Sequence, residues 1–139
     1  MYLYRQAVLF QHCDLAGIVF FPRYFEMLNA AVESWFGERL GHSFARLHGE
    51  MRAGLPTARI EVEFKQPSRL GDMLEIGLRL SRLGRSSAGL SFEARSGGQL
   101  RLAAASVLVY VRLPEGRPAP WPEALRAALQ QELEDGADA

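Results

Sequence analysis

The chain has 139 residues, of which 48% are hydrophobic and 23% charged, as expected for one soluble globular domain spanning residues 1–139. Its sixteen Lys and Arg residues balance sixteen Asp and Glu residues, so nothing favours binding to nucleic acid or to an anionic membrane. The single cysteine excludes an internal disulfide, and the histidines His12, His42 and His48 lack metal-ligand spacing. No apolar run reaches the roughly 18 residues that span a bilayer, and the N-terminus lacks the signal-peptide pattern, so we expect a cytoplasmic protein without a metal.

The N-terminal third of the chain predicts one strand and then a long buried helix. Residues 2–10 mix aromatic and β-branched side chains, as strands do. Pro22 stands where a helix can begin, because proline is well placed at a first helical position. Apolar residues then recur at three- and four-residue spacing, and Gly37 and Gly41 are stop signals. The apolar face comprises Tyr24, Phe25, Leu28, Ala31, Val32, Trp35 and Phe36. A second short helix and a loop are expected over residues 41–54.

The pattern then changes from helix to strand. In residues 56–67 the apolar side chains of Ile60, Val62 and Phe64 alternate with charged ones. This period of two predicts a strand with one buried face and one polar face. Three more strands are predicted at residues 72–83, 86–96 and 100–113.

The order of these elements predicts the fold class. A final short helix is expected at residues 122–133 and a frayed tail at residues 134–139. Short turns join the later strands, which predicts antiparallel neighbours. One long apolar helix and the sheet that must cover it indicate an α+β fold, with an antiparallel sheet of about five strands wrapped around a long central helix. The strand at 100–113 leaves apolar residues on the outer face, which favours at least a dimer.

The stretch between the first strand and the long helix reads CDLAGIVFFPRY, from Cys13 to Tyr24. It resembles the active-site signature of the hotdog-fold acyl-CoA thioesterases, and most of all that of the 4-hydroxybenzoyl-CoA thioesterase-like family. That signature has an Asp after Cys or Thr, two further residues, Gly, Ile or Val, Val, an aromatic pair, Pro and Tyr. The resemblance implies a hotdog fold, an acyl-CoA substrate and a homo-oligomer. The oligomer is expected to be a dimer or a homotetramer with active sites at the subunit interface.

The start of the long helix is a candidate oxyanion site. The first amides of a helix are unpaired and carry a partial positive charge. Pro22 has no N–H, so the expected donors are the amides near Phe21, Arg23 and Tyr24. Donors aimed at a thioester carbonyl stabilise the oxyanion that forms when the carbonyl is attacked. The resemblance implies that the backbone N–H of Phe21 has this role.

Asp14 is the candidate catalytic carboxylate. It could activate water as a general base, or attack the carbonyl and form a mixed anhydride, and the sequence does not separate these roles. Alternatively, Asp14 could be an ordinary turn residue, because Asp is common in turns. The surrounding motif indicates catalysis instead. Gly17 lets the chain turn tightly and lets a substrate approach the backbone. No metal or redox cofactor is needed for this hydrolysis.

Four other residues are weaker candidates for the active site. Cys13 and His12 are adjacent, and adjacent side chains in extended chain point to opposite sides, so they form a poor nucleophile–base pair. We therefore expect Cys13 to be a buried, inert thiol. His12 is two residues from Asp14 and could support the same site, or could be a satisfied histidine. Asn29 and Glu33 could reach the acyl pocket of a partner subunit, or could lie on a solvated helix face.

The segment SRLGRSSAG is a candidate binding turn for the phosphates of coenzyme A. Arg82, Arg85, Ser86 and Ser87 could hold phosphates by charge-assisted hydrogen bonds. The segment is similar to the phosphate-binding turn of the family, in which a second basic residue stands where this chain has Gly84. We therefore expect fewer contacts with the phosphates than in the family, or a contact from Arg82 instead. An ordinary polar hairpin turn is the alternative.

Three functional alternatives remain beside hydrolysis of an aromatic or short- to medium-chain acyl-CoA. A dehydratase on the same fold needs a His paired with an acid, and no His follows Asp14 in the long helix. A non-catalytic acyl-binding module has no use for an unpaired carboxylate beside a carbonyl. The third alternative is hydrolysis of acyl carrier protein thioesters, because that carrier presents the same pantetheine arm.

Overall fold

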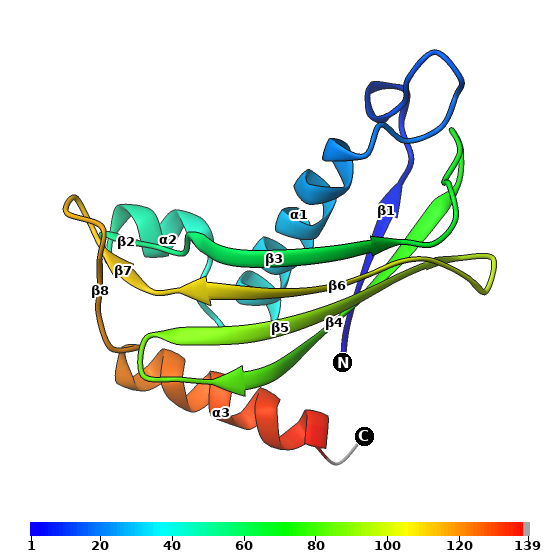
Figure 1. Cartoon of the computed structure of the whole chain (residues 1–139). Coiled ribbons are helices and arrows are strands. Elements are labelled where there is room, and N and C mark those ends of the chain that lie inside the picture. Colours follow the sequence, from blue (N-terminus) through cyan, green and yellow to red (C-terminus); the bar gives the residue numbers. More distant parts are fainter. Residues whose placement is uncertain (138–139) are drawn as a thin grey trace.

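The fold consists of an antiparallel sheet with a long helix packed on its inner face. The computed structural model describes residues 1–137. Five strands form the main sheet (Figure 1), and every pair of neighbours is antiparallel. From edge to edge they are β1 (Tyr2–Ala7), β4 (Met73–Leu83), β5 (Ser87–Ser96), β6 (Gln99–Val109) and β3 (Thr57–Phe64). The predicted α+β architecture, with about five strands wrapped around a helix, is confirmed.

Helix α1 (Pro22–Glu38) begins at the predicted proline, with Phe21 as its N-cap. Seven of its residues are buried: Tyr24, Met27, Leu28, Ala31, Val32, Trp35 and Phe36. The helix continues through Gly37, so this glycine is not the stop signal that the sequence suggested. The chain turns instead near Gly41, whose φ of 69° lies in the left-handed region that favours glycine.

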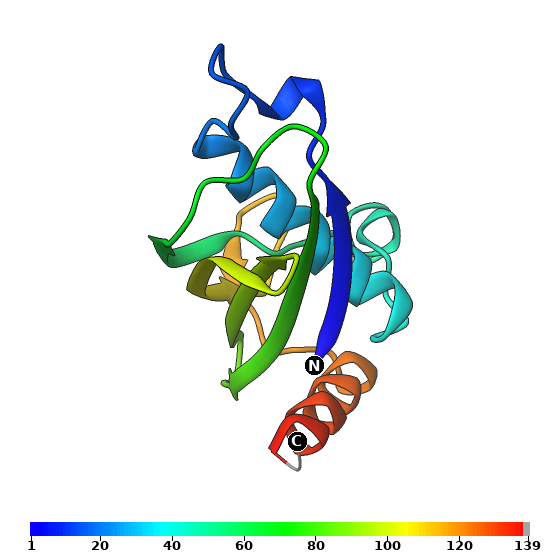
Figure 2. The ribbon, with the colours of Figure 1, turned by 90° about the vertical axis from the view of Figure 1, so that its right-hand side faces the viewer.

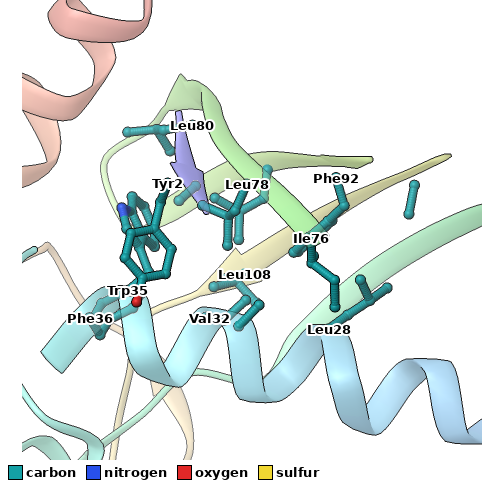
Figure 3. Close-up of a cluster of buried hydrophobic side chains, with 14 of the residues drawn as sticks. Tyr2, Leu28, Val32, Trp35, Phe36, Ile76, Leu78, Leu80, Phe92 and Leu108 are labelled. Atoms are coloured by element: carbon teal, nitrogen blue, oxygen red, sulfur yellow. The ribbon is translucent and has the colours of Figure 1, made fainter. Parts of the chain in front are cut away.

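The inner face of the sheet is defined by the strand register. Leu78 of β4 lies opposite Tyr2 of β1 and Phe92 of β5, and all three side chains are buried. Figure 3 shows these side chains facing α1, together with Ile76 and Leu80. The alternation predicted for residues 72–83 is therefore confirmed, and it places alternate side chains of β4 in the core.

Strand β3 differs from its prediction in position and in burial. It pairs with β6 at the edge of the sheet and not with β4, which follows it in the chain. Ile60 and Phe64 were expected to be buried, but their side chains are 37% and 48% exposed. The physical reason is that α1 packs mainly against β1 and β4, at the edge of the sheet opposite to β3. Within the chain, α1 covers this side of β3 only in part, for example where the Tyr24 ring lies 5.7 Å from that of Phe64.

The remaining elements enclose the ends of the core. Helix α2 (Phe44–Gly49) confirms the predicted short helix. A small sheet that the sequence did not predict contains the two-residue strands β2 (Ala53–Gly54), β7 (Val111–Arg112) and β8 (Arg117–Pro118). In residues 1–137 no helix is both long and apolar enough to cross a membrane.

The C-terminal helix α3 (Glu123–Ala137) is longer than predicted. It extends through residues 134–137, which were expected to fray, while residues 138 and 139 of that predicted tail lie outside the described residues. Leu125 and Leu129 are buried, and α3 packs beside β4. The Trp35 indole N–H donates to Glu132 Oε1 at 2.6 Å, which joins α3 to α1.

The outer face of the sheet is less apolar than expected. Ala103 of β6 lies between Glu63 of β3 and Glu93 of β5 in the register. Ala105 lies next to Glu61 in the same way. Small side chains therefore alternate across the strands with charged ones on the outer face, where Val107 and Val109 also lie, while Leu102 and Leu108 are buried on the inner face. Exposed apolar side chains also occur on β3 and at the start of α1.

Truncating a core side chain of β4 should strongly destabilise the protein. Leu78 is 1% exposed, whereas Leu3 on the adjoining strand is 47% exposed. We expect Leu78→Ala to lower the free energy of unfolding by about 2–5 kcal/mol, because it removes buried methyl groups and leaves a cavity. Leu3→Ala, the matched control, should change it by less than about 1 kcal/mol. Urea unfolding of both variants measures the difference, and similar losses would contradict the described packing.

Candidate active site

Asp14 lies in a tight loop between β1 and α1. A single turn of 3-10 helix (Phe10–His12) precedes it. Cys13 and Val19 then pair as an isolated bridge. Inside this bridge the Asp14 N–H donates to Ile18 O at 3.0 Å, and the Gly17 N–H donates to Asp14 O at 3.1 Å. Gly17 has a φ of 75°, a left-handed conformation that few side chains tolerate. The glycine of the motif is therefore needed for the loop to close.

The carboxylate of Asp14 has one oxygen engaged and one free. Oδ1 accepts hydrogen bonds from the N–H groups of Ala16, at 2.9 Å, and Ile18, at 3.4 Å. Oδ2 accepts none from residues 1–137, and the side chain is exposed. Asp14 thus forms the turn through one carboxylate oxygen and leaves the other oxygen without a partner in the described residues. The turn fixes one oxygen and leaves the second available to water or to a carbonyl carbon.

Asp14 lines an open cavity of about 560 Å³. The walls are mainly apolar: Phe10, Gln11, Cys13, Leu15, Gly17, Phe20, Arg23 and Leu70 line it with Asp14. Phe10 is 81% exposed and Phe20 is 50% exposed, so two aromatic rings face the opening. Arg23 is the one cationic side chain among the lining residues, and its Nη1 donates to Glu26 Oε1 at 2.8 Å.

At the start of α1, one of the three predicted backbone donors is free among the described residues. Of the three predicted donors, the Arg23 N–H donates to Phe20 O at 2.9 Å and the Tyr24 N–H donates to Phe21 O at 3.1 Å. These two amides are already satisfied, which corrects the prediction. Among residues 1–137, the Phe21 N–H donates no hydrogen bond. Phe21 therefore remains the candidate oxyanion donor, although its side chain lines a separate cavity of about 250 Å³ with Tyr24 and Phe64.

His12 and Cys13 take part in the structure of the loop. His12 is buried, and its Nδ1 accepts the Leu9 N–H at 2.9 Å. This bond places the proton of the neutral ring on Nε2. His12 does not line the Asp14 cavity, so contact with a substrate remains a prediction that would need Nε2. Cys13 is half-buried, with its Sγ 3.5 Å from Leu9 O, and it does line the cavity.

The structure separates Asn29 and Glu33 from Asp14. Both line a different cavity of about 500 Å³ between α1 and the start of β3. Pro56, Thr57 and Leu108 form its opposite wall. This cavity lies beside the exposed apolar side of β3. If Asn29 and Glu33 reach the acyl pocket of a partner subunit, as predicted, that subunit must pack against this side of β3.

The predicted phosphate turn also lies far from Asp14 in the same chain. Asp14 lies next to the residues that precede β4, whereas Arg85, Ser86 and Ser87 follow the other end of that strand. The eleven residues of β4 span about 33 Å in extended conformation. Figure 1 shows the loop before α1 and the β4–β5 turn at opposite ends of the sheet. The structure does not bring the two predicted sites together within one chain.

The turn itself is held from several sides. Ser86 O accepts the Tyr110 N–H at 2.7 Å, and Arg85 O accepts the Trp121 N–H at 3.1 Å. The side chains of Arg82 and Arg85 remain exposed. A Cβ at Gly84 would lie 2.5 Å from Ser87 Oγ. A side chain at position 84 would therefore require the Ser87 hydroxyl to rotate away, since the other nearby atoms lie 3.6 Å or farther.

Sequence reasoning missed several residues of the Asp14 cavity. Phe10 and Phe20 were assigned only to a strand and a connection, yet both face the opening. Arg23 was considered only for its amide, although its side chain lines the cavity. Leu70 comes from the segment between β3 and β4, which no motif marked. The one signal available in the sequence was the aromatic side chains of Phe10 and Phe20, which lie beside and within the motif.

Comparison with known proteins supports the resemblance. The profile of the Thioesterase-like superfamily matches residues 8–129. A 1,4-dihydroxy-2-naphthoyl-CoA hydrolase from Synechocystis is 26% identical, over 92% of this chain and 94% of the relative. A gentisyl-coenzyme A thioesterase superimposes with a TM-score of 0.82 at 25% identity, covering 93% of this chain and 99% of that one. A Thermus thermophilus thioesterase complexed with coenzyme A and Zn gives a TM-score of 0.78 at 31% identity, covering 95% and 93%.

The fold, the position of the Asp14 loop and the profile match define a hotdog thioester hydrolase. The chain belongs to the Thioesterase-like superfamily.

Replacing Gly17 should strain the Asp14 loop. A Cβ at Gly17 would meet no atom within 4 Å, so the cost arises from its φ of 75° alone. We expect Gly17→Ala to lower the free energy of unfolding by roughly 1–2 kcal/mol and to reduce kcat. Gly49→Ala is the control, since that position in α2 is equally open and has no left-handed φ. Alanine should stabilise the helix there by up to about 1 kcal/mol. Equal effects at both positions in urea unfolding would contradict this explanation.

Proposed function

We propose that the protein hydrolyses the thioester of an aromatic acyl-CoA to the free acid and coenzyme A, with Asp14 as the reacting carboxylate. The observation that carries the proposal is the free Oδ2 of Asp14 in an open, mainly apolar cavity. Phe20 lines the same cavity, and the N–H of the next residue, Phe21, has no partner among residues 1–137. The superfamily match supports the same chemistry. A cytoplasmic location is part of the proposal.

Two routes to the product use the same groups. As a general base, Asp14 takes a proton from water while the water oxygen attacks the thioester carbon. As a nucleophile, Asp14 Oδ2 forms a mixed anhydride, which water then hydrolyses. In both routes the C–S bond breaks, and the departing thiolate takes up a proton. The Phe21 N–H would stabilise the oxyanion, and removing such a donor typically costs about 10²–10³ in rate.

An aromatic acyl group fits the cavity walls best. The rings of Phe10 and Phe20 offer faces and edges for stacking, and Leu15 and Leu70 extend the apolar wall. The names of two relatives refer to hydroxylated aromatic acyl-CoAs, dihydroxynaphthoyl-CoA and gentisyl-CoA. Hydrolysis of acyl carrier protein thioesters is the second candidate, because the open cavity would admit the shared pantetheine arm.

The exposed apolar side of β3 and the two separated half-sites favour an active site shared between subunits. Phe21 and Phe64 are about half exposed and their rings contact each other edge to face. A coenzyme A molecule on Asp14 could meet a turn containing Arg82, Arg85, Ser86 and Ser87 only if a second copy supplied it. We therefore include a dimer or a homotetramer in the proposal, with Asn29 and Glu33 near the subunit interface.

Removing the charge of Asp14 should abolish most of the activity. We expect Asp14→Asn to fold normally and to lose at least about 10²-fold in kcat, because neither route can start without the carboxylate. Cys13→Ala, which changes the next residue in the same cavity, is the control and should cost little. Release of free thiol from a panel of aromatic, short and long acyl-CoAs measures both. A fully active Asp14→Asn variant would contradict the proposed role, and an inactive but folded Cys13→Ala variant would assign the nucleophile to the thiol.

The same panel tests the competing functions. Turnover of one class of acyl-CoA by the unmodified protein names the substrate. Turnover of acyl carrier protein thioesters alone would identify the second candidate. Acyl-CoA binding without any thiol release would indicate a non-catalytic acyl-binding module and would overturn the proposal.

A shared site predicts complementation between two defective variants. Asp14→Asn lacks the carboxylate, and a double variant Arg82→Ala/Arg85→Ala lacks the proposed phosphate contacts. If each site takes Asp14 from one copy and the turn from another, co-refolding equal amounts should form about a quarter of the sites with both parts intact. We expect the mixture to be clearly more active than either variant alone. If the activity of the mixture equals the mean of the activities of the two variants, then one chain supplies both parts or the turn is not used.

A further inference from the structure

The loop that contains Asp14 is held by a segment that is distant in sequence. We refer to residues 65–72, which lead from β3 into β4, as the bracing segment. The Val19 N–H donates to Ser68 O at 2.9 Å, and the Leu70 N–H donates to Gly17 O at 3.0 Å. Ile18 and Arg69 form an isolated antiparallel bridge. In Figure 2 the bracing segment runs across the upper part of the molecule beside the loop before α1.

Arg101 of β6 holds this bracing segment from the sheet. Its Nη1 donates to Asp72 Oδ2 at 2.8 Å and to Pro67 O at 3.0 Å. Its main-chain oxygen accepts the Lys65 N–H at 2.8 Å. Asp72 Oδ2 also accepts the Arg69 N–H at 2.9 Å. The Arg101 side chain thus joins Pro67 to Asp72, its main chain holds Lys65, and the Asp72 carboxylate holds Arg69.

The Arg101–Asp72 pair differs in burial from the other ion pairs among residues 1–137. Its side chains are 11% and 29% exposed, whereas those of the neighbouring Arg5–Glu75 pair are 69% and 45% exposed. The Arg69 N–H and then the Arg101 guanidinium hold the pKa of Asp72 below its usual value. Asp72 is therefore charged at neutral pH. Breaking a shielded pair leaves a poorly solvated charge, which an exposed pair does not.

Neither member of the pair lines the Asp14 cavity. We propose that Arg101 and Asp72 are positioning residues for the hydrolysis, acting through the bracing segment to fix Gly17–Val19 and thereby the carboxylate of Asp14. The inference rests on the proposed function. The chain of contacts is short: Arg101 to Asp72, Asp72 to the Arg69 amide, and residues 68–70 to residues 17–19. A displacement of about 1 Å at a reacting group can cost roughly 10²-fold in rate.

The test compares Arg101→Met, which keeps much of the side-chain volume, with Asp72→Asn and the double variant. We expect Arg101→Met to lower kcat about 10- to 100-fold and to leave KM nearly unchanged, because the substrate contacts remain. The double variant should lose little more activity than Arg101→Met alone, since both changes break one contact. Arg101→Lys keeps the charge and should retain part of the activity. Arg5→Met is the matched control at the exposed pair and should leave kcat unchanged.

Hydrogen exchange gives a readout that does not require activity. In Arg101→Met the amides of Val19 and Leu70 should exchange faster, while that of Leu78 in the core should not. A lower melting temperature with unchanged kcat and unchanged exchange at these two amides would show that the pair contributes only to overall stability. That result would overturn the inference. A rise in KM with normal kcat would also overturn it, by indicating substrate contact. If the unmodified protein hydrolyses no thioester, the proposed function fails, and exchange alone still decides whether the pair holds the loop.

Discussion

The packing of α1 on the sheet is the interaction on which the rest of the structure depends. Trp35 and Phe36 anchor one end of the helix in the core, and Leu28 packs nearer its start. Because the helix is fixed along its length, its N-terminus has a fixed position above one end of the sheet. The Asp14 loop joins β1 to that N-terminus, so the core fixes both ends of the loop that holds the carboxylate.

The local chemistry of the loop adds what the core cannot supply. Gly17 permits a turn so tight that Asp14 Oδ1 is bound by amides of its own loop. The loop has few buried side chains, so its position relies on backbone contacts with residues 68–70. The proposed function therefore depends on two separate kinds of interaction: a buried helix that positions the candidate donor, and backbone contacts that hold the loop of the candidate carboxylate.

The sequence predicted the parts of this arrangement that have local causes. Pro22 marked the helix start, and the alternation around Leu78 marked a strand with one buried side. The burial of Ile60 was predicted wrongly, because alternation reports which side of a strand is apolar and not whether anything covers it. The contribution of Leu70 to the cavity had no local signal, because strand order brings it to Asp14. The contact of Arg101 with Asp72 depends on tertiary pairing in the same way.

The sheet order also determines when this chain can fold as it leaves the ribosome. Tyr2 pairs with Leu78, and the Trp35 indole contacts Glu132, 97 positions later. Contacts of such long sequence separation slow folding, because a large loop must close before they form. At a synthesis rate of about 5–20 residues per second, the apolar side of α1 stays uncovered for several seconds until β4 to β6 have emerged. The aromatic side of α1 is therefore exposed to solvent on the nascent chain until the strands that cover it have been made.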